Sequence, residues 1–433
     1  MLADEKEQVR KPKTHVRRVY NPLVYAWVVW LVASLFYSIE YLQRVSPTVM
    51  AIPLMRSFHM NAETLSFISS LYFYSYAVAQ IPVGLLLDRY GARLLLSLAC
   101  AVISLGSLLF ALSHMLWLLG VARILIGFGS AFAFIGVLKL AASWFPDKRY
   151  ALMVGLTNSL GVAGAIFGQA PLAKLVEVSG WQTSMIILSV IGFFISLLIW
   201  VLILDCPICL LNSHVKKKRQ LPKGQLMMAL KAIISQPQSW VTAFYAGLMV
   251  VPIIAFGELW AVPFLTQQYN LTPVMAANIN SAIFIGIGVG GPVNGWLSTH
   301  FNQQRSIMLL GNIGAFCSLM LVLYFNLHFV PLLFLLLFIF GFCTSSMLIA
   351  FSINKARFPR EYNGTVAAFT NIVIVILGAV FQDVIGYILE HWKMTVGQGS
   401  YSLADYHLAF IVLPIISLLC LALLFFVDKS HKG

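Results

Sequence analysis

Twelve long apolar runs limit what this chain can fold into more than any other feature of its sequence. They cover residues 23–53, 64–87, 92–112, 116–144, 150–174, 181–204, 239–265, 274–299, 306–325, 331–355, 364–389 and 405–427. A helix needs roughly 20 apolar residues to cross a lipid bilayer, and each run is long enough. None alternates in polarity over about 10 residues, as a strand of a membrane barrel does. We therefore expect an all-α membrane protein with twelve transmembrane helices.

The charge content agrees with this class. Of the 433 residues, 60% are hydrophobic and 10% are charged, whereas a soluble domain usually has about a quarter charged residues. The sequence contains no G-x-x-x-x-G-K-[S/T] loop and no soluble part large enough for an ATPase domain. It also lacks the repeated filter segment of a channel. We predict a multi-pass protein that is not an enzyme, with no catalytic residue, metal site or cofactor.

The net charge of +13 could indicate a nucleic-acid partner, but the positions of the basic residues indicate a membrane topology instead. An even number of helices puts both termini on one side, and basic loops stay in the cytoplasm. The opposite side holds only Arg56, Lys174 and Lys393 in its loops. We expect both termini in the cytoplasm, no nucleic acid, and the plasma (inner) membrane as the location if the protein is bacterial.

Two halves of the chain repeat each other. WFPDKRYALMVGLTN (144–158) matches RFPREYNGTVAAFTN (357–371), and AIPL (51–54) matches AVPF (261–264), at nearly the same offset. The predicted divisions are a cytoplasmic tail 1–22, a six-helix bundle 23–205, a cytoplasmic linker 206–237, a second bundle 238–427 and a tail 428–433. Parallel repeats of this kind occur in transporters that hold their substrate between the halves, near the middle of the membrane.

GLLLDRYGAR (84–93) resembles the G-x-x-x-D-R-x-G-R-R/K signature of the major facilitator superfamily, although Ala92 departs from it. The resemblance implies two parallel six-helix bundles, alternating access and a monomer. In that family the signature governs the conformational switch, a role that falls here on Gly84, Asp88, Arg89, Gly91 and Arg93. We expect Gly84 to allow close helix contact, Gly91 to allow a tight turn, and Asp88 to pair with an arginine or a helix end.

ARILIGFGSA (122–131) resembles the fourth-helix motif R-x-x-x-G-x-G-x-A of the same family, which adds Arg123 to the residues of the switch. Alternatively, Arg123 lies near the outer end of its helix and only extends its side chain to the membrane surface. The fifth run lacks the G-P-x-x-G-G ending typical of proton-driven drug exporters, and its absence argues against multidrug efflux.

YLQRVSPTVMAIPL (41–54) and VLKLAASWFPDKR (137–149) look like the organic-anion and organophosphate branches of the superfamily. In those branches an arginine at the position of Arg44 binds an anionic substrate. The organophosphate exchangers pair it with a second arginine in the seventh helix. Here the seventh run has no arginine and contains Glu258 instead, which argues against a phosphate clamp.

Ionisable residues inside the apolar runs are costly, at roughly 2.5–3.5 kcal/mol each near a helix centre, and so mark functional sites. Glu40 and Arg44 are four residues apart, share a helix face and can pair. We predict that Arg44 binds a carboxylate or phosphate, while Glu40 holds Arg44 when the site is empty or binds the coupling proton. The alternative is a static pair that joins two helices. Lys139 could bind substrate, close the inner gate or be structural.

Glu258 is the best candidate for a carboxyl group that titrates during transport, because burial raises a carboxyl pKa and a nearby cation lowers it. An alternative is an acid at the outer interface. The predicted proton-coupling residues are Glu40, Glu258 and Asp383. The predicted substrate-binding residues are Arg44, Tyr41, Tyr72, Tyr76, Lys139, Gln169, Trp260 and Gln382, although aromatic residues at this spacing also serve packing.

The sequence thus predicts a secondary active transporter that takes up a small polar organic anion or zwitterion together with protons. Three alternatives stay open. The protein could export a drug- or siderophore-like metabolite, carry dipeptides or amino acids, or act as a non-transporting sensor on the same scaffold.

Overall fold

The structure is a computed structural model, and it describes residues 22–205, 225–327, 329–359, 362–393 and 401–427. The predicted terminal tails and most of the predicted linker lie outside these residues. Every regular element in the described part is helical. The prediction of an all-α membrane protein is therefore confirmed.

The helices of the first half follow the predicted apolar runs, with two breaks. They are α1 (Pro22–Val45), α2 (Pro47–Phe58), α3 (Ala62–Tyr90), α4 (Ala92–Ala111), α5 (Leu116–Trp144), α6 (Asp147–Phe167) and α7 (Ala170–Leu202). The first predicted helix is divided where Pro47, which has no N–H to donate, opens α2. Gln169 lies at the break between α6 and α7, outside regular helical geometry.

The second half contains α8 (Gln225–Ile234), α9 (Pro237–Pro252), the π-helix η2 (Ile253–Trp260), α10 (Ala261–Tyr269), α11 (Pro273–His300), α12 (Gln304–Tyr324), α13 (Val330–Thr344), the 3-10 turn η3 (Ser345–Met347), α14 (Leu348–Ala356), α15 (Asn363–His391), α16 (Leu403–Phe410) and α17 (Val412–Phe426). Elements α9, η2 and α10 follow one another without a gap and form one apolar stretch, Pro237–Tyr269.

Eleven stretches of the described residues are long and apolar enough to cross a membrane. One of them, Leu152–Leu202, is 51 residues long, which is about 77 Å of helix and enough to cross twice. Gly180, at φ +80°, breaks its helical geometry and separates two of the predicted runs. Many large apolar side chains point outward, as with Val178 at 74% and Phe425 at 73% exposure. Such a surface suits lipid, and the protein is a multi-pass integral membrane protein.

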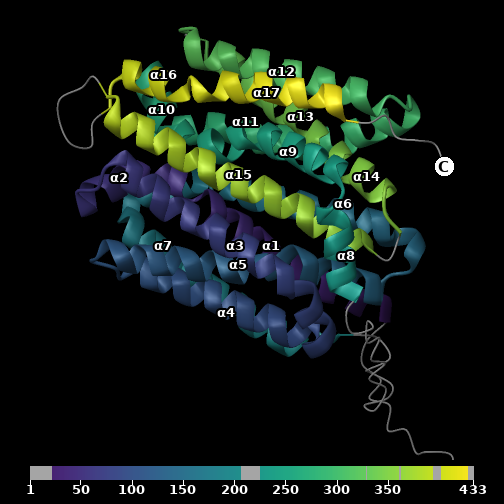
Figure 1. Cartoon of the computed structure of the whole chain (residues 1–433). Coiled ribbons are helices and arrows are strands. Elements are labelled where there is room, and N and C mark those ends of the chain that lie inside the picture. The colour runs from purple at the N-terminus through teal and green to yellow at the C-terminus, as the bar shows by residue number, and fades with distance from the viewer. Residues whose placement is uncertain (1–21, 206–224, 328, 360–361, 394–400, 428–433) are drawn as a thin grey trace, which may run out of the picture.

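The helices lie side by side between two ends of the molecule (Figure 1). Elements α2, α10 and α16 are at one end, called here the α2 end, and α8 and α14 are at the opposite end, called the α8 end. The two halves of the chain meet where α3 packs on α15, α11 packs on α6 and α7, and α2 packs on η2 and α10. We call this contact surface the seam.

Two glycines bring helices of the first half close together beside the seam. A Cβ atom at Gly164 would lie 2.0 Å from the carbonyl oxygen of Ser38, so α6 packs directly on the backbone of α1. A Cβ atom at Gly127 would lie 2.1 Å from the carbonyl oxygen of Tyr72. These approaches fix α1 and α3, the helices that carry the polar side chains described next.

Candidate substrate site at the seam

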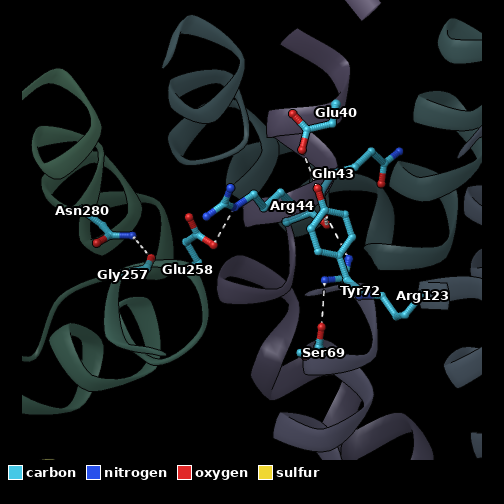
Figure 2. A network of polar contacts seen from close by, with 10 residues as sticks. Glu40, Gln43, Arg44, Ser69, Tyr72, Arg123, Gly257, Glu258 and Asn280 are labelled. Carbon is cyan, nitrogen blue, oxygen red and sulfur yellow. Dashed lines mark hydrogen bonds and ion pairs between the residues drawn. The ribbon is translucent and has the colours of Figure 1, made fainter. Parts of the chain in front are cut away.

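Arg44 and Glu258 form an ion pair across the seam. Arg44 is in the last turn of α1, and its Nε donates a hydrogen bond to Oε2 of Glu258 in η2 over 3.0 Å. Figure 2 shows the two side chains pointing toward each other from opposite halves of the chain. Their side chains are only 13% and 2% exposed. A buried pair of this kind is costly to break by removing one partner, because the remaining charge is left without compensation.

Glu258 owes its position to an irregular stretch of backbone. Residues Ile253–Trp260 form a π-helix of eight residues, all of them buried. π-helical turns are rare, and they occur frequently at functional sites. The carbonyl oxygen of Gly257, next to Glu258, accepts a hydrogen bond of 2.8 Å from Nδ2 of Asn280 in α11 (Figure 2). The π-helix therefore carries its carboxyl group at a defined point of the seam.

The pair leaves hydrogen-bonding capacity unused on both sides. In the described part of the chain, Arg44 donates a hydrogen bond only through Nε, and Oε1 of Glu258 has no partner. The guanidinium group lies 5.2 Å from the ring of Tyr41 and 5.3 Å from the ring of Phe73, measured from Cζ to each centroid. The planar fork of an arginine binds carboxylates with two parallel hydrogen bonds. Arg44 can thus donate hydrogen bonds to another anion in place of Glu258.

Glu40 has a different partner from the one predicted. Its Oε1 accepts a hydrogen bond of 2.5 Å from the hydroxyl of Tyr72, and its side chain is buried. The predicted pairing of Glu40 with Arg44 is therefore wrong in this structure, because Tyr72 of α3 supplies the donor for Glu40 and the second half supplies the acid for Arg44. The ring of Tyr76 stacks on Tyr72, with 6.1 Å between centroids. Both tyrosines lie beside the predicted anion site.

Arg123 is held inside the first half. Its Nη1 and Nη2 donate to the carbonyl oxygens of Gln43 and Ser69, over 3.1 and 3.3 Å. Its Cζ lies 4.9 Å from the centroid of the Tyr72 ring (Figure 2). Arg123 is only 2% exposed, so the alternative that its side chain extends to the membrane surface is wrong. Hydrogen bonds to backbone carbonyls hold this charge between α1 and α3.

Three of the remaining predicted residues contact the opposite half at other points of the seam. Gln169 accepts a hydrogen bond of 3.0 Å from Asn280, and Gln382 donates one of 3.3 Å to the carbonyl oxygen of Ser66. Oδ2 of Asp383 accepts one of 2.8 Å from the hydroxyl of Tyr74. Each of these three contacts joins a residue of the first half to a residue of the second half.

Lys139 and Trp260 are not brought to Arg44. Nζ of Lys139 bonds to the carbonyl oxygen of Leu87 in α3, within the first half. The ring of Trp260 faces Tyr406 of α16, within the second half, at 6.3 Å between centroids. The indole nitrogen of Trp260 is buried and has no partner in the described part of the chain. Among the described residues, no three His, Cys, Asp or Glu side chains gather where they could hold a metal ion.

The sequence matches the Major Facilitator Superfamily over residues 26–382 and 261–433, which together leave only the first residues unmatched. The chain belongs to this superfamily. The fold agrees, since a solved bacterial homolog of the human lysosomal transporter Spinster superimposes with a TM-score of 0.79 at 14% identity, over 95% of this chain and 98% of that one. Fold and family are those of transporters, as the prediction of a non-enzyme requires.

Several relatives in the superfamily are named as transporters of acids. The chain is 27% identical over 266 residues to the hexuronate transporter of Bacillus subtilis, covering 60% of this chain and 62% of the relative. It is 23% identical to a probable galactarate/D-glucarate transporter of Escherichia coli, covering 83% and 86%. An uncharacterized transporter of Bacillus subtilis is 32% identical over 174 residues, which span 40% of each chain. The matched segments thus span less than two thirds of two of these three relatives.

The superfamily signature lies at the junction of α3 and α4. Gly91 has φ +88°, in agreement with the predicted turn, and a Cβ atom there would lie 2.5 Å from Oδ2 of Asp205. The same carboxylate accepts a hydrogen bond from the backbone N–H of Arg93, whose side chain bonds to the carbonyl oxygen of Trp200. Arg89 lies over the ring of its neighbour Tyr90.

The predictions for Gly84 and for Asp88 in this signature have different outcomes. Gly84 makes no close helix contact, since a Cβ atom there would meet nothing within 4 Å, and that prediction is wrong in this structure. The side chain of Asp88 lies outside the described part, so its predicted pairing stays a prediction.

Sequence reasoning did not single out Asn280 or Phe73. Asn280 could have been found, because a side-chain amide within the apolar run 274–299 is itself a sign of an interhelical hydrogen bond. Phe73 gives no such signal, because it is one apolar residue among many in its helix.

Proposed function

We propose that this protein takes up a small hydroxylated organic anion, such as a sugar acid, in symport with protons. The observation that carries the proposal is the ion pair between Arg44 and Glu258, which joins the two halves by a carboxylate that a substrate carboxylate can replace. Alternating access requires such a contact, because the halves must separate and close again around the site during each cycle.

Substrate and Glu258 compete for the same arginine. A carboxylate that reaches Arg44 can bind both Nη groups and form the bidentate geometry that Glu258, bonded through Nε alone, does not use. Oε1 of Glu258 has no partner in the described part of the chain and can accept a hydrogen bond from a substrate hydroxyl. An anion that also carries hydroxyl groups therefore suits both sides of the pair.

The competition between substrate and Glu258 for Arg44 couples substrate binding to proton uptake. When the substrate takes Arg44, Glu258 loses its counter-charge while it remains buried, and an uncompensated buried charge costs several kcal/mol. Taking up a proton removes that cost, so substrate and proton bind together. Release runs in reverse, because Glu258 loses its proton to the opposite side and returns to Arg44. Glu40, hydrogen-bonded to Tyr72 inside the first half, is a second acid in this environment.

The relatives support the substrate class. Hexuronate, galactarate and glucarate, in the names of the relatives, are hydroxylated carboxylates. We also propose that both termini are cytoplasmic, from the basic loops, that the protein acts as a monomer, and that the helix bundles have the predicted boundaries. The α2 end then faces outward, and the packing of α2 on η2 and α10 closes the seam on the outer side.

The test is transport by the purified protein in proteoliposomes. A pH gradient, alkaline inside, is imposed while sugar acids, amino acids, dipeptides and lipophilic cations are screened. We expect uphill accumulation of a sugar acid by the wild type. Glu258→Gln should still exchange labelled for unlabelled substrate but lose at least ten-fold in gradient-driven accumulation, because it no longer carries a proton.

Glu177→Gln is the matched control, since Glu177 is 56% exposed and pairs with Lys174 of its own helix. It should accumulate substrate as the wild type does. Normal accumulation by Glu258→Gln would contradict the coupling role. Transport of dipeptides or cations in place of sugar acids would contradict the substrate class.

A further inference from the structure

Asn280 connects the two halves of the chain through a single side chain. It lies in α11 and is fully buried. Its Nδ2 donates one hydrogen bond of 2.8 Å to the carbonyl oxygen of Gly257 and another of 3.0 Å to Oε1 of Gln169. Gly257 precedes Glu258 in the π-helix, and Gln169 belongs to the first half. One amide group therefore contacts both the backbone beside the titratable acid and the opposite side of the seam.

The contacts form a path that leaves the first half and returns to it. Gln169 is bonded to Asn280, Asn280 to Gly257, and the next residue, Glu258, to Arg44. Figure 2 shows the part of this path from Asn280 to Arg44. The two seam contacts are therefore joined through the π-helix, next to the carboxyl group that is proposed to compete with the substrate.

The amide pair is only half satisfied. Nε2 of Gln169 and Oδ1 of Asn280 are both buried and without partners in the described part of the chain. A buried polar atom without a partner costs about 1–3 kcal/mol, and this cost disappears when water reaches the group. The contact between Gln169 and Asn280 is therefore suited to open when the halves separate, whereas a fully satisfied amide pair would resist separation.

We propose that Asn280 is a positioning residue that couples opening of the seam at Gln169 to the placement of Glu258. With Gln169 in contact, the Asn280 amide is oriented toward the Gly257 carbonyl and holds the π-helix with Glu258 against Arg44. When Gln169 withdraws, the amide is free to turn, the π-helix relaxes, and Glu258 leaves Arg44 to the substrate. This inference rests on the proposed function for the role of Glu258, but the coupling itself is a property of the protein without substrate.

The same helix offers a matched control. Asn294 also lies in α11 and is buried, and its Nδ2 also donates to one backbone carbonyl, that of Phe342, and to one side-chain oxygen, that of Ser345. Both of these partners belong to the second half. Asn294 thus repeats the chemistry of Asn280 without crossing the seam.

The first experiment needs no substrate. Hydrogen–deuterium exchange of the full-length protein in lipid nanodiscs is followed in peptides that cover residues 253–260. We expect Gln169→Leu, a change in the first half, to speed exchange in this segment of the second half by about fivefold to tenfold, the effect of one lost hydrogen bond. Asn280→Leu should do the same, and Gln169→Leu should add nothing to it. Asn294→Leu should leave the segment as in the wild type.

Two results would overturn the proposal. One is unchanged exchange of residues 253–260 in Gln169→Leu, which decides the matter even if Asn280→Leu does not fold. The other is an equal effect of Asn294→Leu, which would mean that any lost amide in α11 loosens the segment.

The second experiment measures uptake of the best sugar acid. Asn280→Leu should lower the half-saturating concentration at least threefold, because Glu258 competes less well for Arg44, and should lower gradient-driven accumulation by about tenfold. A purely structural role would reduce the amount of active protein and leave the half-saturating concentration unchanged. If no organic anion is transported, the proposed function fails, while the exchange experiment still decides whether Asn280 couples the two halves.

Discussion

Arg44, which is mostly buried, and Arg123, which is fully buried, lie in the same bundle, and their partners differ in kind. Arg44 donates to the carboxylate of Glu258, which comes from the opposite half of the chain. Arg123 donates to two backbone carbonyls of its own half and lies over the ring of Tyr72. The carboxylate of Glu258 can take up a proton, be replaced by another anion or move away with its bundle. The backbone carbonyls that bind Arg123 can move away only if the helices of the first half separate.

The comparison separates two uses of a charge inside a membrane. Both arginines bear the cost of burial, and each offsets it with hydrogen bonds. A charge compensated by backbone dipoles of the same bundle joins helices permanently. A charge compensated by a side chain across the seam is suited to take part in the transport cycle, as we propose for Arg44. In this superfamily member, the partner of an intramembrane arginine indicates its role better than the arginine itself does.

The largest expected effect concerns transport and Arg44. Arg44→Leu should reduce sugar-acid uptake at least a thousandfold, about 4 kcal/mol at 1.4 kcal/mol for each tenfold, because Arg123, the other arginine of this region, is bonded to two backbone carbonyls of its own half. Uptake into proteoliposomes measures this loss. The arginine variants are unfolded in detergent at about pH 4.5, near the ordinary pKa of a glutamate. At this pH Glu258 can take up a proton at little cost when its partner is lost, so Arg44→Leu should change the unfolding temperature little.

A second variant, Arg44→Lys, tests whether transport needs the planar guanidinium group or only a positive charge. A lysine keeps the charge but not the planar fork, so it should raise the half-saturating concentration severalfold while keeping measurable transport. If Arg44→Leu takes up sugar acid as the wild type does, Arg44 is not part of the substrate site. A large loss of stability in Arg44→Leu would place it with Arg123 as a structural residue.

The second effect concerns stability and Arg123. Arg123→Leu should lower the free energy of unfolding by about 2–4 kcal/mol, because two hydrogen bonds from a charged donor are lost and two buried carbonyls lose a partner. Unfolding in mixed detergent micelles measures the change, with Arg44→Leu as the matched comparison. Equal stability of the two variants would contradict the distinction drawn between the arginines.

Much of the fold was predictable, because the constraint that lipid imposes is local. Each apolar run of the sequence had to be a helix, since no other element satisfies its own backbone in a bilayer. The turn at Gly91 was predictable for a similar reason, as glycine tolerates a positive φ that other residues avoid. These conclusions need only the residue and its immediate neighbours.

The partners of the charged residues were not predictable in the same way. The spacing of Glu40 and Arg44 correctly places them on one helix face, yet their partners come from other helices. Tyr72 is 32 residues from Glu40, and Glu258 is 214 residues from Arg44. The π-helix that presents Glu258 adds a second difficulty, because its wider turn shifts side chains from the positions that a regular helical period predicts. The arrangement of the helices in space, and not the spacing within one helix, therefore decides which residues pair.

The smallest effect concerns Tyr72, which contacts both acidic and basic groups of the first half. Its hydroxyl donates to Glu40, and its ring lies under Arg123. Tyr72→Phe keeps the ring and removes only the hydroxyl, so it should cost about 1 kcal/mol of unfolding free energy. A double-mutant cycle with Glu40→Leu, which removes the acceptor, isolates the contact and should give a coupling energy of about 1 kcal/mol.

Tyr245→Phe, which removes a buried hydroxyl bonded to the backbone carbonyl of Met308, is the control and should be additive with Glu40→Leu. Strict additivity of Tyr72 and Glu40 would mean that the bond between them contributes nothing, and that Glu40, like Glu258, is free to take another partner during transport.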